Sequence, residues 1–463
     1  MVYWRNIPSD ATVRSPYSSS SKNAQPHYLT FEYDGGGWNN MRMSIETVVA
    51  LAVAMGRTLV LPPRHRVSNF GTAIEYHELF TLDLLEKETQ SRVISMEDFL
   101  RQEGLSGRLR NKETGQVEFP PGNRTNWDRG EDAHQLFDWL RTVTLTPIWF
   151  PDVCYATFPA GGPNGTDDVF RRAMDKINNT TNVKPVAARH NGTLEERMRE
   201  MHVKRQNLCT YDRAMQEAPV VHIMYSIEPY VRLLTHFYTF VLFEDWRADL
   251  WMKRFIRDHV RYNDAIQCAA ARVVRAVRRR AREADPNGNP DGLFDSFHIR
   301  RGDFEKVYKF TQLSNTEIYN ITQPYLRPNA TLYIATDERN RTFFQPLRDH
   351  YTLIFLDDVV DEAGVDPHLY GLIEQLVAAR GQTFFGTYVS TFTSYIMRIR
   401  GYHALQEHAP GSDEGMLPST FFYTPKENLH LMHQFAPVKI HFFEREYSIA
   451  WRHIDDGIGQ LPS

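Results

Sequence analysis

Residues 28–62 read YLTFEYDGGGWNNMRMSIETVVALAVAMGRTLVLP. The first seven residues are rich in β-branched and aromatic side chains, as strands are, and RTLVLP is a second such run that ends in proline. Between them, a glycine-rich loop precedes a segment whose apolar residues recur at helical spacing: Met43, Val48, Leu51, Ala52 and Met55. Gly56 stands where the end of a helix favours glycine. A strand, a helix and a strand with short connections predict a βαβ unit in a parallel sheet.

The same alternation returns later in the chain. Residues 285–292, DPNGNPDG, contain only Pro, Gly, Asn and Asp, which predicts a domain boundary. Strand-like and helix-like segments then alternate from LFDSFHIR at 293–300 to TFTSYIMRIRGY at 391–402. This pattern predicts a second doubly wound domain. We therefore expect an α/β protein with two Rossmann-like domains, residues 28–285 and 292–463, that face each other across a cleft.

Length, charge and hydropathy narrow the class of protein. A chain of 463 residues exceeds one ordinary core of about 250–300 residues, which also favours two domains. The net charge of −4 argues against a nucleic-acid partner. No run of about 18 apolar residues predicts a membrane span, so a membrane connection would require an anchor upstream of this chain. Residues 1–27 are polar and rich in Ser and Pro, without the apolar core of a signal peptide, and we expect a flexible leader.

The cellular compartment is indicated by cysteines and glycosylation triplets. The three cysteines, Cys154, Cys209 and Cys268, have no metal-ligand spacing and allow at most one disulfide. Eight Asn-x-Ser/Thr triplets begin at Asn123, Asn164, Asn178, Asn179, Asn191, Asn320, Asn329 and Asn340. This number favours the lumen of the endoplasmic reticulum or Golgi. The alternative is that several triplets arose by chance and the protein is cytoplasmic.

The stretch SFHIRRGDF, residues 296–304, ends a predicted strand in fixed positive charge. Arg300 would lie at the carboxyl edge of the sheet, where open α/β folds bind ligands, and its planar fork of donors suits phosphate oxygens. His298 lies two residues earlier on the same strand face. Asp303 either orients the arginines or caps the segment after the turn. Two alternatives are an exposed RGD tripeptide with an adhesion role and a buried structural Arg–Asp pair.

Three further motifs fit a ligand site at strand ends. In DGGGWNNMR, residues 34–42, glycines let the backbone approach a ligand, and the amides of Asn39 and Asn40 can donate to its oxygens. In residues 384–401, Ser390, Thr391 and the N–H groups around Phe392 predict a phosphate-binding nest or an ordinary helix N-cap. Asp337, just past the strand YIAT, either accepts from a ribose or base or caps a helix.

The order of these motifs resembles the GDP-fucose-dependent fucosyltransferases, especially the protein O-fucosyltransferase families. The resemblance covers residues 28–62 and 293–402, and residues 63–292 are unmatched. It implies the GT-B arrangement of two Rossmann-like domains, with GDP-fucose held mainly by the C-terminal one. The acceptor site would then lie in the unmatched region, where Trp149 and Phe150 either stack on a sugar or belong to the core.

The resemblance also implies roles for individual residues. Arg300 corresponds to the arginine that contacts the diphosphate and is needed for turnover, and Asn40 corresponds to the asparagine of the glycine loop. The expected GDP-sugar-binding residues are Gly36, Gly37, Trp38, Asn39, His298, Asp337, Glu374, Ser390, Thr391, Phe392 and Thr393. This sequence departs from the family's pattern at two positions, the general base and the residue that recognises guanine. Gly35, Gly36 and Gly37 replace the glutamate that some members carry, and Gln382 replaces an aspartate that reads guanine, a task that Glu374 or Asp337 would share.

The implied function is that of an inverting glycosyltransferase. It would move fucose from GDP-fucose to a hydroxyl acceptor, with Ser or Thr of a protein favoured. We expect no metal and no cofactor, because no Asp-x-Asp pair occurs and Arg300 with helix N-termini would neutralise the departing phosphate. The alternatives are fucosyl transfer to a glycan or polysaccharide and a non-catalytic module that binds a nucleotide sugar.

Overall fold

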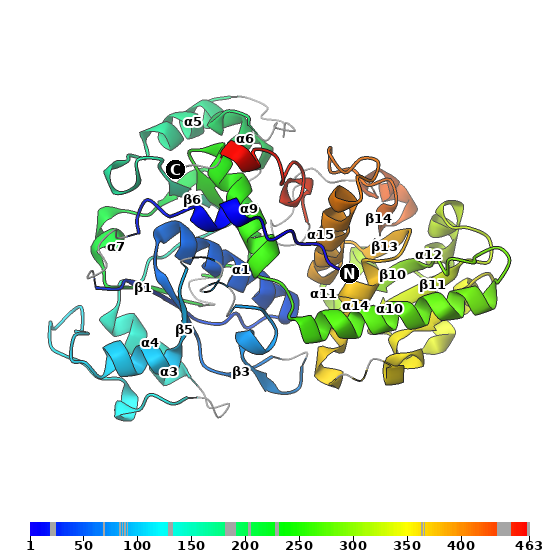
Figure 1. Ribbon diagram of the computed structural model, residues 1–463, viewed down its shortest axis with the longest axis horizontal. Coiled ribbons are helices and arrows are strands. Elements are labelled where there is room, and N and C mark those ends of the chain that lie inside the picture. Colours follow the sequence, from blue (N-terminus) through cyan, green and yellow to red (C-terminus); the bar gives the residue numbers. More distant parts are fainter. Residues whose placement is uncertain are drawn as a thin grey trace. The chain divides into compact units, whose positions relative to one another are not determined.

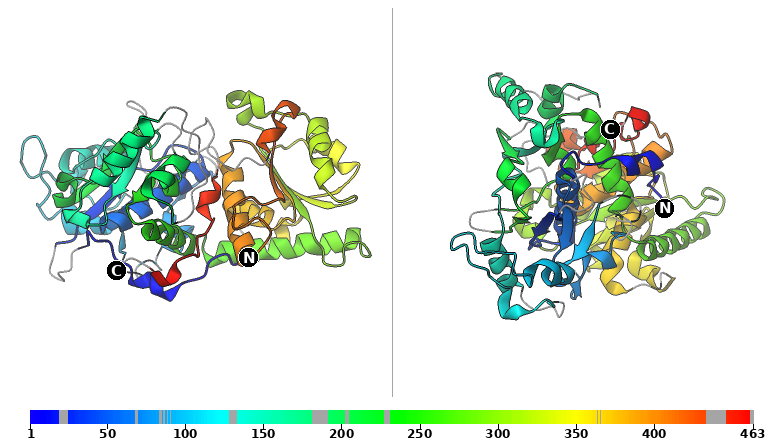
Figure 2. Two further views of the ribbon diagram at one scale, coloured as in Figure 1. Left: turned by 90° about the horizontal axis from the view of Figure 1, so that it is seen from above. Right: turned by 60° about the vertical axis from the view of Figure 1, so that its left-hand side comes forward.

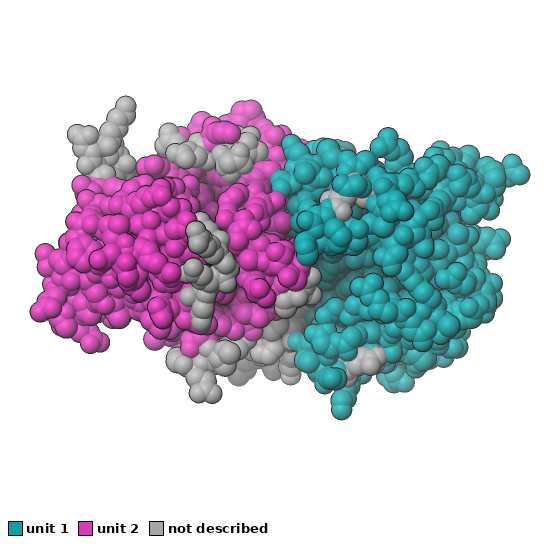
Figure 3. Space-filling model, turned by 90° about the horizontal axis from the view of Figure 1, so that it is seen from below, with its two compact units in different colours: residues 1–4, 262–436, 444–452 teal, residues 5–261, 437–443, 453–463 magenta. Residues whose placement is uncertain are grey.

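The computed structural model describes residues 1–463 except 19–24, 68–69, 83–84, 86, 88, 90, 128–132, 181–190, 202–204, 227–230, 363, 365, 433–445 and 461–463. Contacts divide the chain into two compact units (Figure 3). Unit 1 comprises residues 1–4, 262–436 and 444–452, and unit 2 comprises residues 5–261, 437–443 and 453–463. Both units are built on parallel sheets, which confirms the predicted α/β class.

Unit 1 contains a five-stranded parallel sheet with strand order β12-β11-β10-β13-β14. The strands are β10 (Asp295–Ile299), β11 (Thr331–Thr336), β12 (Thr352–Phe355), β13 (Phe384–Thr387) and β14 (Thr420–Tyr423). All residues of β10 and β13 are buried, as expected for central strands covered by helices on both faces. Phe297 of β10 pairs with Ile334 on one side and Phe385 on the other.

Helices cover both faces of this sheet (Figure 1). On one face lie α10 (Asp264–Ala284), α14 (Tyr370–Ala378) and α15 (Thr391–Gln406). On the other face, α12 (Asn315–Thr322) and α13 (Gln345–Arg348) enclose a core that includes Phe297, Ile299, Ile318, Ile321, Phe344 and Leu347. The short helix α11 (Phe304–Val307) follows β10.

The division between the units falls before α10, not at residues 285–292 where the sequence predicted it. The buried Ala and Val stripe of α10 packs on α14, and Tyr262 donates to Oε1 of Gln375 at 2.8 Å. The turn at 285–292 therefore connects two elements of one unit, α10 and β10. Pro- and Gly-rich composition marks a sharp turn, but it does not say whether a domain ends there.

The predicted βαβ unit opens the first sheet of unit 2, which has the order β5-β2-β1-β8. Its strands are β1 (Tyr28–Phe31), β2 (Thr58–Leu61), β5 (Val93–Ser95) and β8 (Val220–Ile223), all parallel. Helix α1 (Trp38–Met55) connects β1 and β2 and ends at Gly56, whose φ of +66° is the left-handed conformation that glycine favours. Helices α3 (Met96–Phe99) and α4 (His134–Val143) contribute to a buried apolar cluster with β1, β2 and β8.

A second parallel sheet in unit 2 was not predicted. It has the order β7-β6-β9, with β6 (Cys154–Phe158), β7 (Asn207–Thr210) and β9 (Val241–Phe243). A disulfide between Cys154 and Cys209 joins β6 and β7, and Cys268 is free. Other α-helices and strands in the described part of unit 2 are α5 (Asp168–Asn178), α6 (Leu194–Met201), α7 (Arg213–Glu217), α8 (Phe237–Phe240), α9 (Trp246–His259), β3 (His65–Arg66) and β4 (Ala73–Ile74). A single Rossmann-like domain over 28–285 is therefore too simple.

The N-terminal segment is docked rather than a flexible leader, within its described residues 1–18 and 25–27 (Figure 2). Residues Pro8–Thr12 form a 3-10 turn, and its Asp10 makes a buried ion pair with Arg254 of α9 at 2.7 Å. The indole N–H of Trp251 donates to the Asp10 carbonyl at 3.1 Å. A polar composition suggested disorder, but these long-range bonds hold the segment. Among the described helices, none has the length and apolar character needed to cross a bilayer.

Candidate functional site

Charged and hydroxyl side chains gather at the carboxyl edge of the sheet in unit 1. Arg300 directly follows β10, and its backbone N–H donates to Oγ1 of Thr387 at the end of β13, 2.8 Å away. The same hydroxyl donates to the carbonyl of His298 at 3.1 Å and contacts Oη of Tyr423 on β14. These bonds tie three neighbouring strand ends together and fix where Arg300 leaves the sheet.

The guanidinium of Arg300 contacts two carboxylates. Its Nη1 lies 2.8 Å from Oδ2 of Asp337, and its Nη2 lies 2.5 Å from Oδ1 of Asp303. Arg–Asp pairs are therefore present, but they are not the buried pair considered as an alternative, because the side chains of Arg300 and Asp303 are 26% and 71% exposed. Asp303 contacts the arginine, and its side chain makes no capping hydrogen bond to α11.

The RGD tripeptide, residues 301–303, is part of this turn, in which Arg301 is half-buried and Gly302 and Asp303 are exposed. Arg301 donates its backbone N–H to Oδ1 of Asp337 and its Nε to Glu338, at 2.8 and 3.0 Å. Gly302 has a φ of +28°, and a Cβ there would lie 2.5 Å from Oδ2 of Asp337. Asp337 thus anchors the turn after β10. It caps no helix, because the following 3-10 turn is capped by Asn340.

His298 is buried beside the start of α15. Its Nδ1 lies 2.7 Å from Oγ1 of Thr393, and its ring stacks on Phe392 with centroids 4.4 Å apart. Burial, helped by the nearby charge of Arg300, lowers the pKa of His298 to about 3. The imidazole is therefore uncharged at physiological pH and can donate or accept a hydrogen bond without carrying charge.

The turn from β13 into α15 has the form of an anion site. Val389 has a φ of +58°, a conformation that a β-branched residue rarely adopts and that costs about 1–3 kcal/mol. Ser390 precedes the helix, but its side chain makes no capping hydrogen bond, so Ser390 is not an ordinary side-chain N-cap. The N–H groups of the first turn of α15 have no acceptor within the helix. Strain at Val389 is consistent with a turn shaped for a ligand.

Glu374 joins this edge from α14. Partial burial and the neighbouring carboxylates of Asp357 and Asp337 raise the pKa of Glu374 to about 8. Gln382, in contrast, lies just before β13 at the amino edge of the sheet, where its N–H donates to the carbonyl of Phe294 at 2.7 Å. Gln382 therefore lies at the edge of the sheet opposite to Arg300, and its effect on nucleotide recognition stays a prediction.

The glycine loop of unit 2 follows β1. The carboxylate of Asp34 accepts from the N–H of Gly36 at 2.8 Å and pairs with the guanidinium of Arg232. A Cβ at Gly36 would lie 2.6 Å from Nδ2 of Asn40, so a larger residue there would displace the amide of Asn40. Asn40 is half-buried, whereas Asn39 is buried. Trp38, predicted to contact the nucleotide sugar, is 5% exposed and packs between Phe70 and Phe80.

A buried polar network behind this loop was missed in the sequence. Glu32, directly after β1, accepts from Nε of Arg141 at 2.7 Å and lies 3.0 Å from Nε2 of His222 on β8. Burial alone would raise the pKa of Glu32, but the hydrogen bonds from His222 and Arg141 bring it below its usual value. A carboxylate at the end of a buried strand was the available signal. Its partners come from distant segments and carry no local pattern.

The two aromatic residues offered as an acceptor platform take different positions. Trp149 is buried and its ring packs edge-on against Phe240 at 6.2 Å, so it belongs to the core. Phe150 is exposed.

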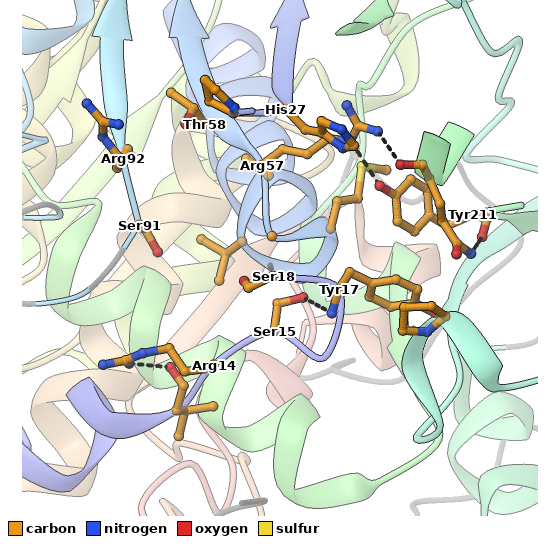
Figure 4. A pocket seen from close by; sticks show the side chains of 18 of the residues that line it. Arg14, Ser15, Tyr17, Ser18, His27, Arg57, Thr58, Ser91, Arg92 and Tyr211 are labelled. Atoms are coloured by element: carbon orange, nitrogen blue, oxygen red, sulfur yellow. Dashed lines mark hydrogen bonds between the residues drawn. The ribbon is translucent and has the colours of Figure 1, made fainter. Parts of the chain in front are cut away.

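A cavity of about 770 Å³ lies at the amino ends of β1 and β2 in unit 2 (Figure 4). It is lined by Ser15, Tyr17, His27, Thr58 and other residues, none of which was predicted as a site residue. Arg57, which also lines it, donates to Oη of Tyr211 at 2.9 Å and to the carbonyl of Tyr28 at 3.1 Å. The guanidinium of Arg57 thus makes hydrogen bonds that stabilise the fold of unit 2.

An arginine, a neutral histidine and a helix N-terminus at the carboxyl edge of a parallel sheet are typical of α/β proteins that bind nucleotides or phosphates. The sequence profile described as GDP-fucose protein O-fucosyltransferase matches residues 28–403, most of the chain. The chain therefore belongs to the GDP-fucose protein O-fucosyltransferase family. This membership confirms the expected class of enzyme, a GDP-fucose-dependent glycosyltransferase.

Solved structures of fucosyltransferases resemble the chain weakly. POFUT1 in complex with GDP is 14% identical, with a TM-score of 0.42, over 86% of this chain and 99% of that one. NodZ α-1,6-fucosyltransferase soaked with GDP-fucose is 12% identical, with a TM-score of 0.36, over 81% and 92%. A mutant of Arabidopsis thaliana FUT1 in complex with GDP is 10% identical, with a TM-score of 0.39, over 91% and 74%. No curated protein matches the chain in sequence.

Proposed function

We propose that this protein transfers fucose from GDP-fucose to a hydroxyl acceptor with inversion at the anomeric carbon. The favoured acceptor is Ser or Thr of a protein. The observation that carries the proposal is the position of Arg300. Its partly exposed guanidinium leaves the carboxyl end of β10 next to the hydroxyl-rich turn that opens α15.

The chemistry requires cationic and neutral donors around the departing diphosphate. When the bond between sugar and GDP breaks, negative charge develops on the β-phosphate and positive charge on the sugar ring. Arg300, the first-turn N–H groups of α15 and His298 would stabilise the negative end. Asp337 and Asp303 hold the guanidinium in place, and the diphosphate would take over these contacts as it binds. Asp337 then acts through Arg300.

The same groups would do the work of a metal, so we propose transfer without a metal or cofactor. Inversion requires the acceptor hydroxyl to attack from the face opposite GDP. Glu32 is buried and ion-paired with Arg141, which makes it a poor base in this state. A phosphate oxygen of the leaving group is the better candidate to take the proton. The assignment of Asn40 to the donor stays a prediction from the resemblance.

We propose the lumen of the secretory pathway as the compartment. A disulfide between Cys154 and Cys209 requires an oxidising environment to persist. All eight asparagines of the glycosylation triplets are exposed, as acceptors of a glycan must be. Two independent features thus favour the lumen over the cytoplasm.

The proposal is tested with Arg300→Ala. Release of GDP from GDP-fucose, measured with and without acceptor, should fall at least about 10²–10³-fold, since a positioned donor to the developing charge is lost. Arg279→Ala is the control, because this arginine lies on α10 with its side chain 49% exposed and pairs with Glu362. Near-normal turnover in Arg300→Ala refutes the assignment.

Peptide and glycan acceptors, compared in the same assay, separate the candidate functions. Faster GDP release with peptides supports protein O-fucosylation, and faster release with oligosaccharides supports glycan transfer. A protein that binds GDP tightly but neither hydrolyses nor transfers fucose would be a binding module.

A further inference from the structure

We propose that Thr393 is a positioning residue: its hydroxyl holds the proton of His298 on Nε2, so that the histidine presents a neutral N–H to a diphosphate oxygen. The second half of this inference rests on the proposed function. The first half concerns the protein alone and is tested without a substrate.

Thr393 is unable to touch a ligand itself. Its side chain is completely buried in the first turn of α15, with 0% of the residue exposed. Among the described residues, the partner of its hydroxyl is Nδ1 of His298, 2.7 Å away. The sequence placed Thr393 in a phosphate nest, whereas the structure shows that any effect on phosphate has to pass through His298.

The direction of this hydrogen bond follows from the burial of Thr393. A buried hydroxyl needs an acceptor for its proton, and Nδ1 is the acceptor within reach. Thr393 therefore donates and Nδ1 accepts, which leaves the ring proton on Nε2. The opposite arrangement would leave a buried O–H without an acceptor. Within the described part of the chain, Nε2 has no hydrogen-bond partner, so its N–H is available to a ligand.

The surroundings of His298 keep the ring neutral and still. Phe392 covers one face of the imidazole, with the two planes 24° apart. Arg300, two residues along the chain, disfavours a second positive charge, in line with the low pKa of His298. A neutral Nε2–H beside a guanidinium adds a directed donor without repelling it, whereas an imidazolium would compete with Arg300 for the phosphate.

Gly386 explains how α15 comes close enough for this contact. It lies on β13 opposite His298 in the sheet. A Cβ at this position would lie 2.2 Å from Cγ2 of Thr393 and 2.9 Å from its Oγ1. Any other residue would push Thr393 away from the histidine. The glycine in FFGT, which looks unremarkable in a strand pattern, is thus required by the Thr393–His298 bond.

The test uses NMR of the full chain with ¹⁵N-labelled histidine, since the two neutral tautomers differ in their ring nitrogen shifts. His298→Asn assigns the signal among the 18 histidines. Wild type and Thr393→Ser, which keeps the hydroxyl, should show the Nε2–H tautomer. Thr393→Val, which keeps the shape but not the hydroxyl, should lose it, as should Gly386→Ala. An Nδ1–H signal in wild type, or a wild-type spectrum in Thr393→Val, overturns the inference.

Kinetics test whether the Nε2–H of His298 donates to a diphosphate oxygen. In Thr393→Val, kcat/KM for GDP-fucose should fall about 10- to 100-fold, the usual effect of losing a hydrogen bond to a charged group, and Thr393→Ser should restore most of it. A changed tautomer with unchanged kcat/KM overturns the functional half. A wild-type protein with the Nε2–H tautomer but no turnover of GDP-fucose refutes the proposed function and leaves the tautomer assignment in place.

Discussion

Nη1 of Arg300 lies 2.8 Å from Oδ2 of Asp337, and the other oxygen of the same carboxylate accepts the backbone N–H of Arg301, also at 2.8 Å. One aspartate therefore holds both the side chain of the key arginine and the turn that carries it. Under the proposed function, an incoming diphosphate would have to compete with this carboxylate for the guanidinium and would be repelled by its negative charge. Asp337 is thus expected to preset the position of Arg300 while lowering the affinity for the nucleotide.

Asp337→Asn separates these two effects. The amide oxygen can still accept from Arg301, but the negative charge is gone. We expect GDP to bind about 2- to 5-fold more tightly by calorimetry, the range of a partly exposed ion pair, while kcat falls because Arg300 is less well held. Asp349→Asn, a change of the same kind at the exposed end of α13, is the control. Much weaker GDP binding in Asp337→Asn would mean instead that the carboxylate contacts the ligand.

The sequence predicts the position of Arg300 well because local rules govern it. A fully buried parallel strand has a continuous apolar pattern, and its first polar residues necessarily leave the sheet at the carboxyl edge. The same rule places Asp337 after β11 and the Ser/Thr turn after β13. Three of the motifs meet in unit 1 for this reason, although their ligand roles stay predictions.

Contacts between segments that are distant in the sequence could not be predicted from such local rules. The stripe of Ala and Val on α10 fits any apolar surface, so it did not reveal that this helix packs on α14 and belongs to unit 1. The Thr393–His298 bond depends on the space that Gly386 leaves between α15 and the sheet. The second sheet of unit 2 pairs strands separated by long connections, which a local pattern does not register.

Glu374 predicts a dependence of stability on pH. In the folded protein its pKa is raised from 4.5 to about 8, mainly by burial. Between these two values the folded state holds a proton that the unfolded state has released, so this group makes the free energy of unfolding fall as pH rises. Glu374→Gln removes this effect. We expect the variant to match wild type near pH 4.5 and to be more stable at pH 8, measured by urea unfolding at each pH.

A matched variant and a binding measurement complete this test. Glu362→Gln changes an exposed carboxylate of unit 1 that pairs with Arg279, and it should not show the same trend with pH. An equal stability difference between Glu374→Gln and wild type at pH 4.5 and 8 would contradict the raised pKa. If Glu374 shares in reading guanine, as the sequence predicts, Glu374→Gln also weakens the binding of GDP but not of inorganic pyrophosphate.

Removal of divalent cations tests whether the arginine and the helix N-terminus suffice. Because fixed donors would neutralise the departing diphosphate, we expect GDP release from GDP-fucose to be unchanged in excess EDTA and not stimulated by Mg²⁺ or Mn²⁺. The measurement is the initial rate in the presence of acceptor, after exhaustive dialysis against chelator. A loss of activity that Mn²⁺ or Mg²⁺ restores would show that a metal takes part.

The Cys154–Cys209 disulfide predicts a difference between oxidised and reduced protein. It closes a loop between residues 55 positions apart, and cross-links of this kind stabilise proteins by about 2–4 kcal/mol. Cys154→Ser, Cys209→Ser and the double variant should therefore unfold at similar, lower urea concentrations than wild type. Cys268→Ser should behave like wild type, because this thiol is free and exposed.

Reducing agent should lower the urea midpoint of unfolding for wild type and for Cys268→Ser. It should not change the midpoint of the variants that lack the disulfide. Equal midpoints for all variants in oxidising buffer would mean that the two sulfurs are not bonded, and the argument for a lumenal compartment would then depend on the glycosylation triplets alone.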